Sequence, residues 1–342
     1  KLLDYYEKNP NFILPKSRRN EVISFVKGGL KDLSISRKAF SWGIKVPNKP
    51  EHVIYVWLDA LTNYISALNY PDTKDKLFEN FWPASVHLIG KDILRFHAVY
   101  WPAFLMAANI PLPERVYGHG WILSGEEKMS KSKGNILDPL DIINTYGLDP
   151  LRYYLIKEVS FGNDGNISQE RLEDCINSDL ANNFGNLCQR VTAFAEKNCS
   201  LKVPQIKNFN DDDLKILNKF TENLPIIRLE VDKQNINFYI NFIVSVLFEA
   251  NKYFNDQEPW KKKDDNDRLS TIVYTSLEII RKISFMLYPV IPNSIVKALK
   301  IFNLNSKDIN LESITNHNYL KSGSNLKKID ILFKKIEKTK DD

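Results

Sequence analysis

The sequence is poor in several features that would assign it to particular protein classes. It has three cysteines in 342 residues, Cys175, Cys188 and Cys199, which lie 13 and 11 positions apart. This spacing fits neither a disulfide framework nor a C-x-x-C zinc site, and it favours a reducing compartment such as the cytoplasm. No apolar run approaches the roughly 18–20 residues of a membrane span, and no signal peptide opens the chain. We therefore expect a cytoplasmic protein without a membrane partner.

The composition otherwise predicts a globular protein. Apolar residues make up 43% of the chain and aromatic residues 12%, which excludes a disordered chain. Lys and Arg outnumber Asp and Glu by 47 to 42, an excess of +5 that permits a polyanionic partner without proving one. The length predicts two or three domains. Because the first residue is Lys1, we interpret the chain as part of a longer protein.

The first part of the chain alternates between strand-like and helix-like segments. Continuous apolar runs at 52–58 and 86–89, and a weaker one at 115–118, predict strands buried on both faces of a parallel sheet. The segment 93–109 is long enough to be a crossover helix. This order predicts a doubly wound α/β domain, whose functional residues lie at the carboxyl ends of the strands.

After residue 162 the pattern becomes helical. Apolar residues recur at steps of three and four over 176–194, 236–254 and 269–287, and Pro289 and Pro292 end the last run. Amphipathic helices of this kind predict an α-helical bundle. The Lys-rich tail keeps an apolar spacing at Leu326, Ile329 and Phe333, so we expect it to dock on the bundle.

The segment 125–135 is the most informative stretch for chemistry. It contains Lys128, Lys131 and Lys133, with two serines between them and glycines at both ends. Glycines allow close backbone approach, and clustered ammonium and hydroxyl groups can hold a triphosphate and offset charge on leaving pyrophosphate. The order of a Walker A loop is absent. For a generic Lys-Ser cluster, a solvated basic loop would be the ordinary interpretation.

The amino-acid sequence of this segment resembles that of a known family. Residues 128–132, Lys-Met-Ser-Lys-Ser, reproduce the KMSKS motif of class I aminoacyl-tRNA synthetases, with His119-Gly120 before it and 147–154 after it in typical positions. The chain resembles the methionyl-tRNA synthetase family through Trp57-Leu-Asp-Ala60 and Gly90-Lys-Asp92-Ile93, and the likeness runs from 17–20 and 33–37 to 332–337. The resemblance implies catalytic roles for Lys128, Ser130, Lys131 and Ser132.

The resemblance also implies a division of the chain. Residues 1–118 match the second half of a Rossmann-like domain with a doubly wound parallel sheet. Residues 119–172 match the KMSKS module that contacts the tRNA stem, and 173–342 match a helical anticodon-binding domain with a C-terminal tail. The fold class expected is α/β followed by all-α.

A methionine pocket is expected beside the sheet. On a helix, Ile93, His97 and Trp101 share one face just past the strand at Gly90. Polarisable sulfur packs well against aromatic rings, and selectivity against leucine needs shape plus a weak hydrogen bond to sulfur, from Tyr64 or from His97. The alternative is that the aromatic residues are plain core. The residues that the resemblance assigns to methionine are Trp57, Ala60, Leu61, Tyr64, Asp92, Ile93, His97 and Trp101.

The resemblance places an adenylate site next to this pocket. We hypothesise that Arg37 pairs with Asp92, and that Asp92 contacts the ribose or the amino group of the substrate. The alternative is a surface ion pair of little energetic value. The residues assigned to ATP are Arg37, Asp92, His119, Gly120 and Lys131.

A tRNA-reading surface is expected on the bundle. Asn186 and Arg190 lie one helical turn apart and flank the apolar stripe of their helix. In methionyl enzymes an Asn and an Arg at this spacing, with a Trp after Pro, recognise the CAU anticodon, and here the Trp is Trp260 after Pro259. RNA loops are read by stacking bases on aromatic rings or guanidinium planes and by bonding their edges. The alternative interpretation is that Asn186 is a surface amide and Arg190 a solvated charge, with no role in RNA binding.

The reaction that the resemblance implies is methionine–tRNA ligation from L-methionine, ATP with Mg²⁺ as substrate, and tRNA(Met). The H-I-G-H motif of the family does not occur in these 342 residues, so we expect this chain alone to have little adenylating activity. Zinc is expected only in the family's upstream insertion, no metal site is expected here, and a monomer is favoured. The alternatives are a non-catalytic tRNA-binding module and a class I synthetase for another amino acid.

Overall fold

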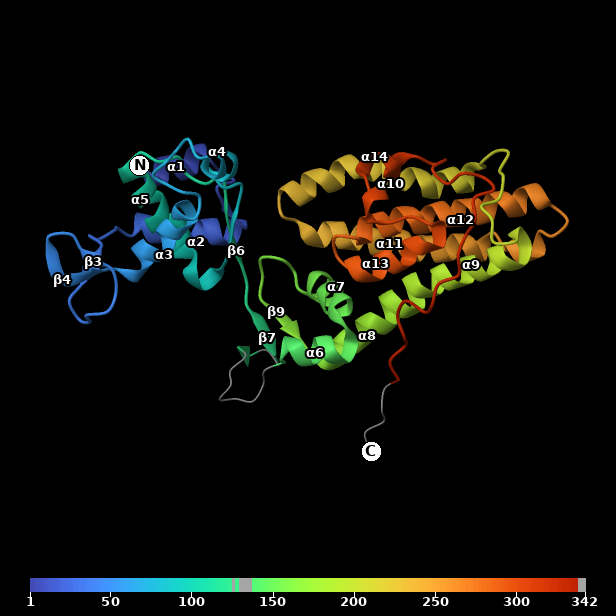
Figure 1. Cartoon of the computed structure of the whole chain (residues 1–342), viewed down its shortest axis with the longest axis horizontal. Helices are drawn as coiled ribbons and strands as arrows, with labels where there is room; N and C mark the ends of the chain where they lie inside the picture. Colours follow the sequence, from blue (N-terminus) through green and yellow to red (C-terminus); the bar gives the residue numbers. More distant parts are fainter. Residues whose placement is uncertain (125–126, 129–136, 338–342) are drawn as a thin grey trace, which may run out of the picture. The chain divides into compact units, whose positions relative to one another are not determined.

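The computed structural model describes residues 1–124, 127–128 and 137–337, without the side chains of 127–128. The chain forms two compact units (Figure 1). Unit 1 consists of Lys1–Trp121 and Gly162–Asp164, and unit 2 of Ile122–Phe161 and Gly165–Asp342. Each described helix is too short or too polar to span a lipid bilayer.

Unit 1 contains a parallel sheet in the strand order β1-β6-β5. Its strands are β1 (Ile13–Leu14), β5 (His87–Gly90) and β6 (Val116–His119). Gly90 pairs with His119, so β5 and β6 end side by side. Helices α1 (Leu2–Lys8) and α2 (Lys16–Lys27) contribute to the core beside this sheet. The two apolar runs at 86–89 and 115–118 therefore form parallel strands, as predicted.

The expected burial of both strand faces is wrong for β5. Ile89 is 5% exposed but its neighbour Leu88 is 54% exposed. Successive side chains of a strand point to opposite faces, so the described part of unit 1 covers only the Ile89 face of β5.

The predicted strand at 52–58 is only partly correct, because 52–54 lie in a strand whereas 56–58 lie in a helix. β4 (Lys49–Ile54) ends before Trp57, and it pairs antiparallel with β2 (Ser36–Arg37) and β3 (Lys45–Val46) in a separate sheet. The remaining apolar residues begin α3 (Val56–Ser66). A short apolar run fits a buried strand and a buried helix equally well. The consequence is that Trp57 lies on a helix.

The segment between β5 and β6 is helical, as predicted, but its geometry is mixed. It consists of η1 (Lys91–Ile93), which is a 3₁₀ turn, η2 (Phe96–Tyr100), which is a π-helix, and α5 (Trp101–Ala108). Helix α4 (Lys76–Phe81) precedes β5 and packs Phe78 into a core with Leu61 and Trp101. Single π-helical turns are frequent at functional sites.

Unit 2 begins with a mixed sheet in the order β8-β7-β9. Its strands are β7 (Ile122–Ser124), β8 (Glu127–Lys128) and β9 (Gly165–Ile167). The helices of this region are α6 (Pro139–Tyr146), α7 (Leu148–Glu158) and α8 (Gln169–Cys175).

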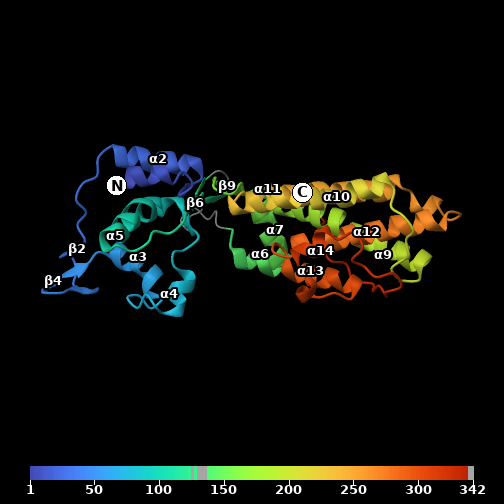
Figure 2. The same ribbon diagram turned by 90° about the horizontal axis from the view of Figure 1, so that it is seen from above.

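The remainder of unit 2 is the predicted helical bundle, in which α10 and α11 lie side by side (Figures 1 and 2). Its long helices are η4 (Ile176–Gly185, a π-helix) continuing into α9 (Asn186–Cys199), α10 (Asp211–Asp232), α11 (Ile236–Asp256) and α12 (Asn266–Leu287). Its short elements are η5 (Pro259–Lys261), α13 (Pro292–Leu299), η6 (Lys300–Phe302), η7 (Ser306–Asp308) and α14 (Leu311–Thr315). Every residue of α12 from Leu269 to Leu287 is buried, so this helix is the centre of the bundle.

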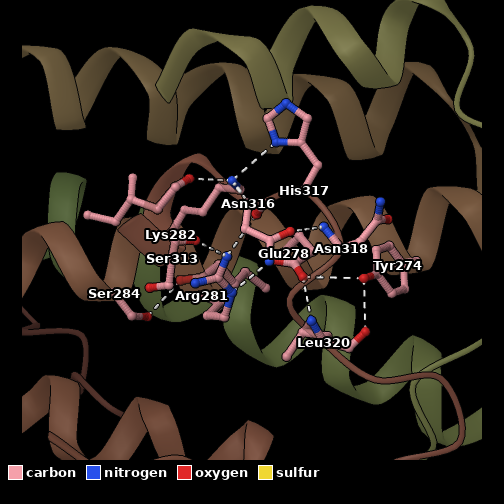
Figure 3. A network of polar contacts seen from close by, with 12 residues as sticks. Tyr274, Glu278, Arg281, Lys282, Ser284, Ser313, Asn316, His317, Asn318 and Leu320 are labelled. Carbon is pink, nitrogen blue, oxygen red and sulfur yellow. Dashed lines mark hydrogen bonds and ion pairs between the residues drawn. The ribbon is translucent and has the colours of Figure 1, made fainter. Parts of the chain in front are cut away.

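A buried polar network ties α12 to the segment 313–320 (Figure 3). Glu278, Arg281 and Lys282 are all 0% exposed. Glu278 accepts from Nε of Arg281 at 2.7 Å and from the Leu320 amide at 2.7 Å. Lys282 donates to the carbonyls of Ile314 and Asn316. Buried charges persist only where partners satisfy them, and here those partners fix a loop against the core.

The C-terminal tail docks on the bundle, as predicted, although it forms no helix up to residue 337. Leu326 is 4% and Phe333 7% exposed. The Ile336 amide and carbonyl bond the side chain of Asn177. The apolar spacing therefore marked contact with the core rather than helix formation.

Candidate functional site

An aromatic cluster lies where α3 meets η2 in unit 1. Trp57 and Tyr64 are two turns apart on α3 and project from the same side of it. The Trp57 ring stacks on Phe96, with centroids 3.9 Å apart and planes 10° from parallel. The rings of Trp57 and Tyr64 both meet His97, at 6.2 Å and 5.6 Å. Two helices thus bring the sequence-predicted pocket residues together.

The proton positions in this cluster follow from its acceptors. His97 Nδ1 lies 3.1 Å from the Ile93 carbonyl, which can only accept, so Nδ1 carries the proton. Burial lowers the pKa of His97, and the neutral ring therefore accepts at Nε2 from the Tyr64 hydroxyl at 2.9 Å. The Tyr64 proton is thus engaged by His97 in this arrangement. Donation by Tyr64 to a thioether sulfur would require its hydroxyl to rotate away from His97.

A second histidine, His87, packs against the aromatic cluster. His87 is 4% exposed, lies 4.2 Å from the Tyr64 ring, and accepts at Nε2 from Nε1 of Trp101 at 3.3 Å. Burial, with a contribution from the charge of His97, lowers the pKa of His87 to about 4. The imidazole is therefore neutral at pH 7 and acts as a fixed acceptor for the Trp101 indole.

The other residues assigned to methionine have different surroundings. Leu61 and Trp101 are 1% and 2% exposed and belong to a core cluster with Phe78 and Trp82. Ile93 is half-buried, whereas Ala60 and Asp92 are exposed. Sequence reasoning did not select Phe96 or His87 for this site. The signal that marks Phe96 is its position beside His97 on the helix that leaves β5.

The carboxyl ends of β5 and β6 gather three of the residues assigned to ATP. A side chain at Gly90 would lie 2.7 Å from Oδ1 of Asp92 and 3.9 Å from the His119 ring, so both groups border the same space. His119 Nδ1 lies 2.8 Å from the Gly120 carbonyl and therefore carries the ring proton. A Cβ at Gly120 would lie 2.1 Å from the Asn163 carbonyl oxygen, so only glycine fits there.

An ion pair that the sequence did not indicate lies beside these strand ends. Lys91 contacts both carboxylate oxygens of Asp164, at 2.6 Å and 2.7 Å, and its ammonium lies 4.1 Å from the centre of the Trp121 ring. The Lys91 hydrogen bond, with that of the Trp121 amide, lowers the pKa of Asp164. The pair anchors residues 162–164 against the strand ends.

The expected pairing of Arg37 with Asp92 is not formed between the described side chains. Arg37 instead donates to the carbonyls of Ser34 and Ser36, at 2.9 Å and 3.2 Å, and lies over the Tyr55 ring at 4.3 Å. It lines a cavity of about 290 Å³ together with Tyr55 and Asp59. Two local carbonyls and the Tyr55 ring thus hold the Arg37 side chain in place.

The KMSKS segment is described only at its beginning. Lys128 lies in β8, where its backbone pairs with Leu123 of β7. Ser130, Lys131 and Ser132 lie outside the described residues.

A separate polar and aromatic cluster lies on the bundle of unit 2. Arg190 donates to Oδ1 of Asn255 at 2.6 Å, and its guanidinium lies 5.4 Å from the centre of the Phe254 ring. Trp260 meets the same ring edge-on at 6.3 Å and is 42% exposed. Asn186 is exposed, one turn before Arg190 on α9. Three helical segments thus place a cation, an amide and a solvent-exposed ring near one another.

Sequence reasoning assigned Phe254 to the apolar stripe and did not consider Asn255. Phe254 is 2% exposed, so that assignment holds, but its ring also supports Arg190 and Trp260. The sequence gives no indication of a role for Asn255, apart from its position next to Phe254.

Comparison with known families matches two models to consecutive parts of the chain. Residues 1–192 match the model described as tRNA synthetases class I (M). Residues 203–342 match the model described as the anticodon binding domain of methionyl tRNA ligase.

Curated relatives agree with these models. The methionine–tRNA ligase of Brucella suis biovar 1 is 53% identical over 302 residues, which is 88% of this chain and 58% of the relative. That of Rickettsia felis is 49% identical over 344 residues, which is 98% of this chain and 66% of the relative. The chain thus spans between about three fifths and two thirds of the length of these relatives.

Solved structures show the same fold. A Mycobacterium tuberculosis methionyl-tRNA synthetase in complex with methionyl-adenylate superposes with a TM-score of 0.92 at 44% identity, covering 97% of this chain and 66% of that one. The free form from the same organism gives a TM-score of 0.91 at 41% identity. The predicted order of a Rossmann-like part followed by a helical bundle is thereby confirmed.

Proposed function

This chain belongs to the methionyl family of class I tRNA synthetases, and from that membership we propose that it is the methionine- and tRNA-recognising part of a methionine–tRNA ligase. The proposed reaction joins L-methionine to ATP, supplied with Mg²⁺, to give methionyl-adenylate and pyrophosphate. The methionyl group then passes to the terminal ribose of tRNA(Met). The observation that carries the proposal is the Tyr64–His97 hydrogen bond, which lies inside an aromatic cluster beside the strand ends.

The aromatic cluster suits an unbranched thioether. Trp57, Tyr64 and His97 offer ring faces and edges, and His87 and His97 are neutral at pH 7. Sulfur packs favourably against aromatic rings, whereas the branched leucine side chain has a different shape and no polarisable atom at that position. A neutral pocket also rejects charged side chains, which would be buried without a partner.

The adenylate is proposed to lie over the strand ends. Asp92 and His119 border the space above Gly90, and Gly120 lets the backbone of residues 162–164 approach. Lys128 and Lys131, with Ser130 and Ser132, are proposed to hold the triphosphate and offset the charge of leaving pyrophosphate. The attacking group is the methionine carboxylate, so catalysis needs positioning and charge stabilisation rather than a protein nucleophile.

The cluster on the bundle is proposed to read the CAU anticodon of tRNA(Met). The exposed Trp260 ring offers a stacking surface for a splayed base, and Arg190 and Asn186 offer donors for base edges. We further propose a monomer in the cytoplasm, consistent with the three free thiols of Cys175, Cys188 and Cys199. Zinc has no proposed role in these residues.

Pyrophosphate exchange by the complete protein, measured with each standard amino acid, tests this proposal. We expect exchange with methionine and at least about a hundredfold less with leucine or isoleucine, because shape and sulfur contacts together are worth about 3 kcal/mol. Preferred exchange with another amino acid would instead identify a sister synthetase. Binding of tRNA(Met) without any exchange would identify a non-catalytic tRNA-binding protein.

A further inference from the structure

The loop that carries Trp260 is held at both of its ends. Gln257 is the C-cap of α11, and Asp265 is the N-cap of α12, where its carboxylate accepts from the Arg268 amide at 3.0 Å. Within the loop, Glu258 has a positive φ of 42° and pairs with Lys261 at 2.8 Å. The position of the Trp260 backbone is therefore set by contacts of the residues on either side of it.

Arg268 joins the two ends of this loop to the core. Its guanidinium forms a fork with Asp213 of α10, with Nη1 to Oδ2 at 2.6 Å and Nη2 to Oδ1 at 3.0 Å. The Asp213 side chain is 0% exposed and that of Arg268 17%. The Tyr253 hydroxyl also donates to Asp213. A buried fork of this kind fixes the guanidinium in one plane.

Gln257 connects the fork to the start of the loop. Its Oε1 accepts from Nη2 of Arg268 at 2.6 Å, and its Nε2 donates to Asp212 at 2.9 Å. Arg268 thus bonds Gln257 through its side chain and Asp265 through its amide. A single residue, Arg268, therefore links the end of α11 to the start of α12.

The Trp260 ring itself is less constrained. It is 42% exposed and meets Phe254 edge-on at 6.3 Å, so small shifts of the loop would move the ring relative to Arg190. Base stacking depends on the position and plane of the ring. We propose that Arg268 and Gln257 are positioning residues for anticodon reading, which hold the Trp260 loop in the geometry that a base requires. This inference rests on the proposed function of the bundle.

The test compares two transcripts of tRNA(Met), one with CAU and one with a changed anticodon, bound to the full chain. The variant is Gln257→Met, which keeps the side-chain length and removes both hydrogen bonds. We expect about tenfold weaker binding of the CAU transcript and less than about twofold change for the other, since the bonds of Gln257 to Arg268 and to Asp212 are both lost. Discrimination is the dissociation constant for the changed transcript divided by that for the CAU transcript. A general loss of stability does not change this ratio.

The matched control is Asp267→Asn. It breaks the exposed Lys207–Asp267 ion pair of 2.6 Å at the same end of α12, one residue from Arg268, and should leave the ratio unchanged. Arg268→Lys keeps the charge and loses the fork, so it should lower the ratio as Gln257→Met does. A fluorine spectrum of protein labelled with 5-fluorotryptophan, with the Trp260 line assigned by Trp260→Phe, should show that line shifted in both variants.

The outcomes separate this inference from the proposed function. If Trp260→Ala abolishes discrimination while Gln257→Met and Arg268→Lys retain it with an unmoved Trp260 line, the positioning role is wrong. If the unmodified chain binds both transcripts equally, the anticodon-reading function is wrong and the positioning role with it. Loss of discrimination in all three variants, with Asp267→Asn normal, supports the inference.

Discussion

The Trp57 indole lies face to face with the Phe96 ring, 3.9 Å between centroids, and this stack joins α3 to the π-helix that follows β5. Trp57→Leu should remove the stack and one wall of the pocket. The lost ring stacking and sulfur contact together amount to about 2 kcal/mol, or roughly 30-fold in KM for methionine. Pyrophosphate exchange at varied methionine measures this. Phe81→Leu, at an exposed ring on α4, is the control, and an unchanged KM in Trp57→Leu would show that methionine binds elsewhere.

Tyr64→Phe tests the hydrogen bond to His97. The change removes the donor that satisfies Nε2 of His97, which costs about 1 kcal/mol net and should raise KM for methionine about fivefold. Binding of tRNA should not change, because Tyr64 lies in unit 1 and Trp260 in unit 2. Tyr70→Phe removes a hydroxyl from the same unit and should behave like the unmodified protein. Equal effects of the two changes would contradict a specific role for Tyr64.

His87 should make the stability of unit 1 depend on pH in acid. Its pKa is about 4 when folded and about 6.5 when unfolded, so the unfolded chain binds more protons between these values. The contribution is complete above pH 6.5 and is lost as pH falls towards 4, by up to about 3 kcal/mol. Five of the six tryptophans lie in unit 1, so urea unfolding followed by tryptophan fluorescence at pH 5 and pH 7 measures it.

The control replaces His87 with a side chain that does not titrate between pH 4 and pH 7. His87→Gln keeps an acceptor for the Trp101 indole and should flatten the difference between pH 5 and pH 7. An equally steep pH dependence in the variant would assign the effect to other groups.

Lys282 should make the stability of the bundle depend on pH above neutral pH, whereas His87 acts in acid. Burial, with the positive charge of Arg281, lowers its pKa to about 7, whereas the unfolded value is about 10.5. The unfolded chain therefore binds more protons between pH 7 and 10.5, and bundle stability should rise with pH across this range. Helix unfolding followed by far-ultraviolet circular dichroism at pH 7 and pH 9 measures the rise.

Lys282→Met should remove this rise and also destabilise the bundle. The Ile314 carbonyl would lose its bond from Lys282, at a cost of about 1–3 kcal/mol at pH 9, whereas the Asn316 carbonyl would keep its bond from Arg281. Lys219→Met, which breaks a partly exposed ion pair with Glu249, should leave the pH dependence in place. If Lys282→Met keeps the rise, the titrating group lies elsewhere.

The helical half was more predictable from sequence than the α/β half. Runs such as 236–254 repeat their apolar period over five turns, and only an amphipathic helix satisfies that pattern. The run at 52–58 is too short to decide, but Trp57, Leu61 and Tyr64 continue at helical steps, and the structure follows them.

Side-chain pairings were less predictable than the elements that carry them. The sequence predicts Ile93, His97 and Trp101 on one helix face, but a π-helix replaces the expected α-helix, and Ile93 and Trp101 pack with different core clusters. His97 bonds only the backbone carbonyl of Ile93. Arg37 finds its partners within three residues, which no spacing rule indicates. The Gln257–Arg268 contact closes a loop whose residues show no apolar periodicity.

Charging of tRNA(Met) transcript by the complete protein tests the central claim most directly. With labelled methionine, we expect esterification that requires the CAU anticodon and that Trp260→Ala reduces sharply, while methionine-dependent pyrophosphate exchange by the same variant stays within about twofold. Charging with a different amino acid, or charging of methionine that ignores both the anticodon and Trp260→Ala, would contradict the proposed division of methionine and anticodon recognition between the two units.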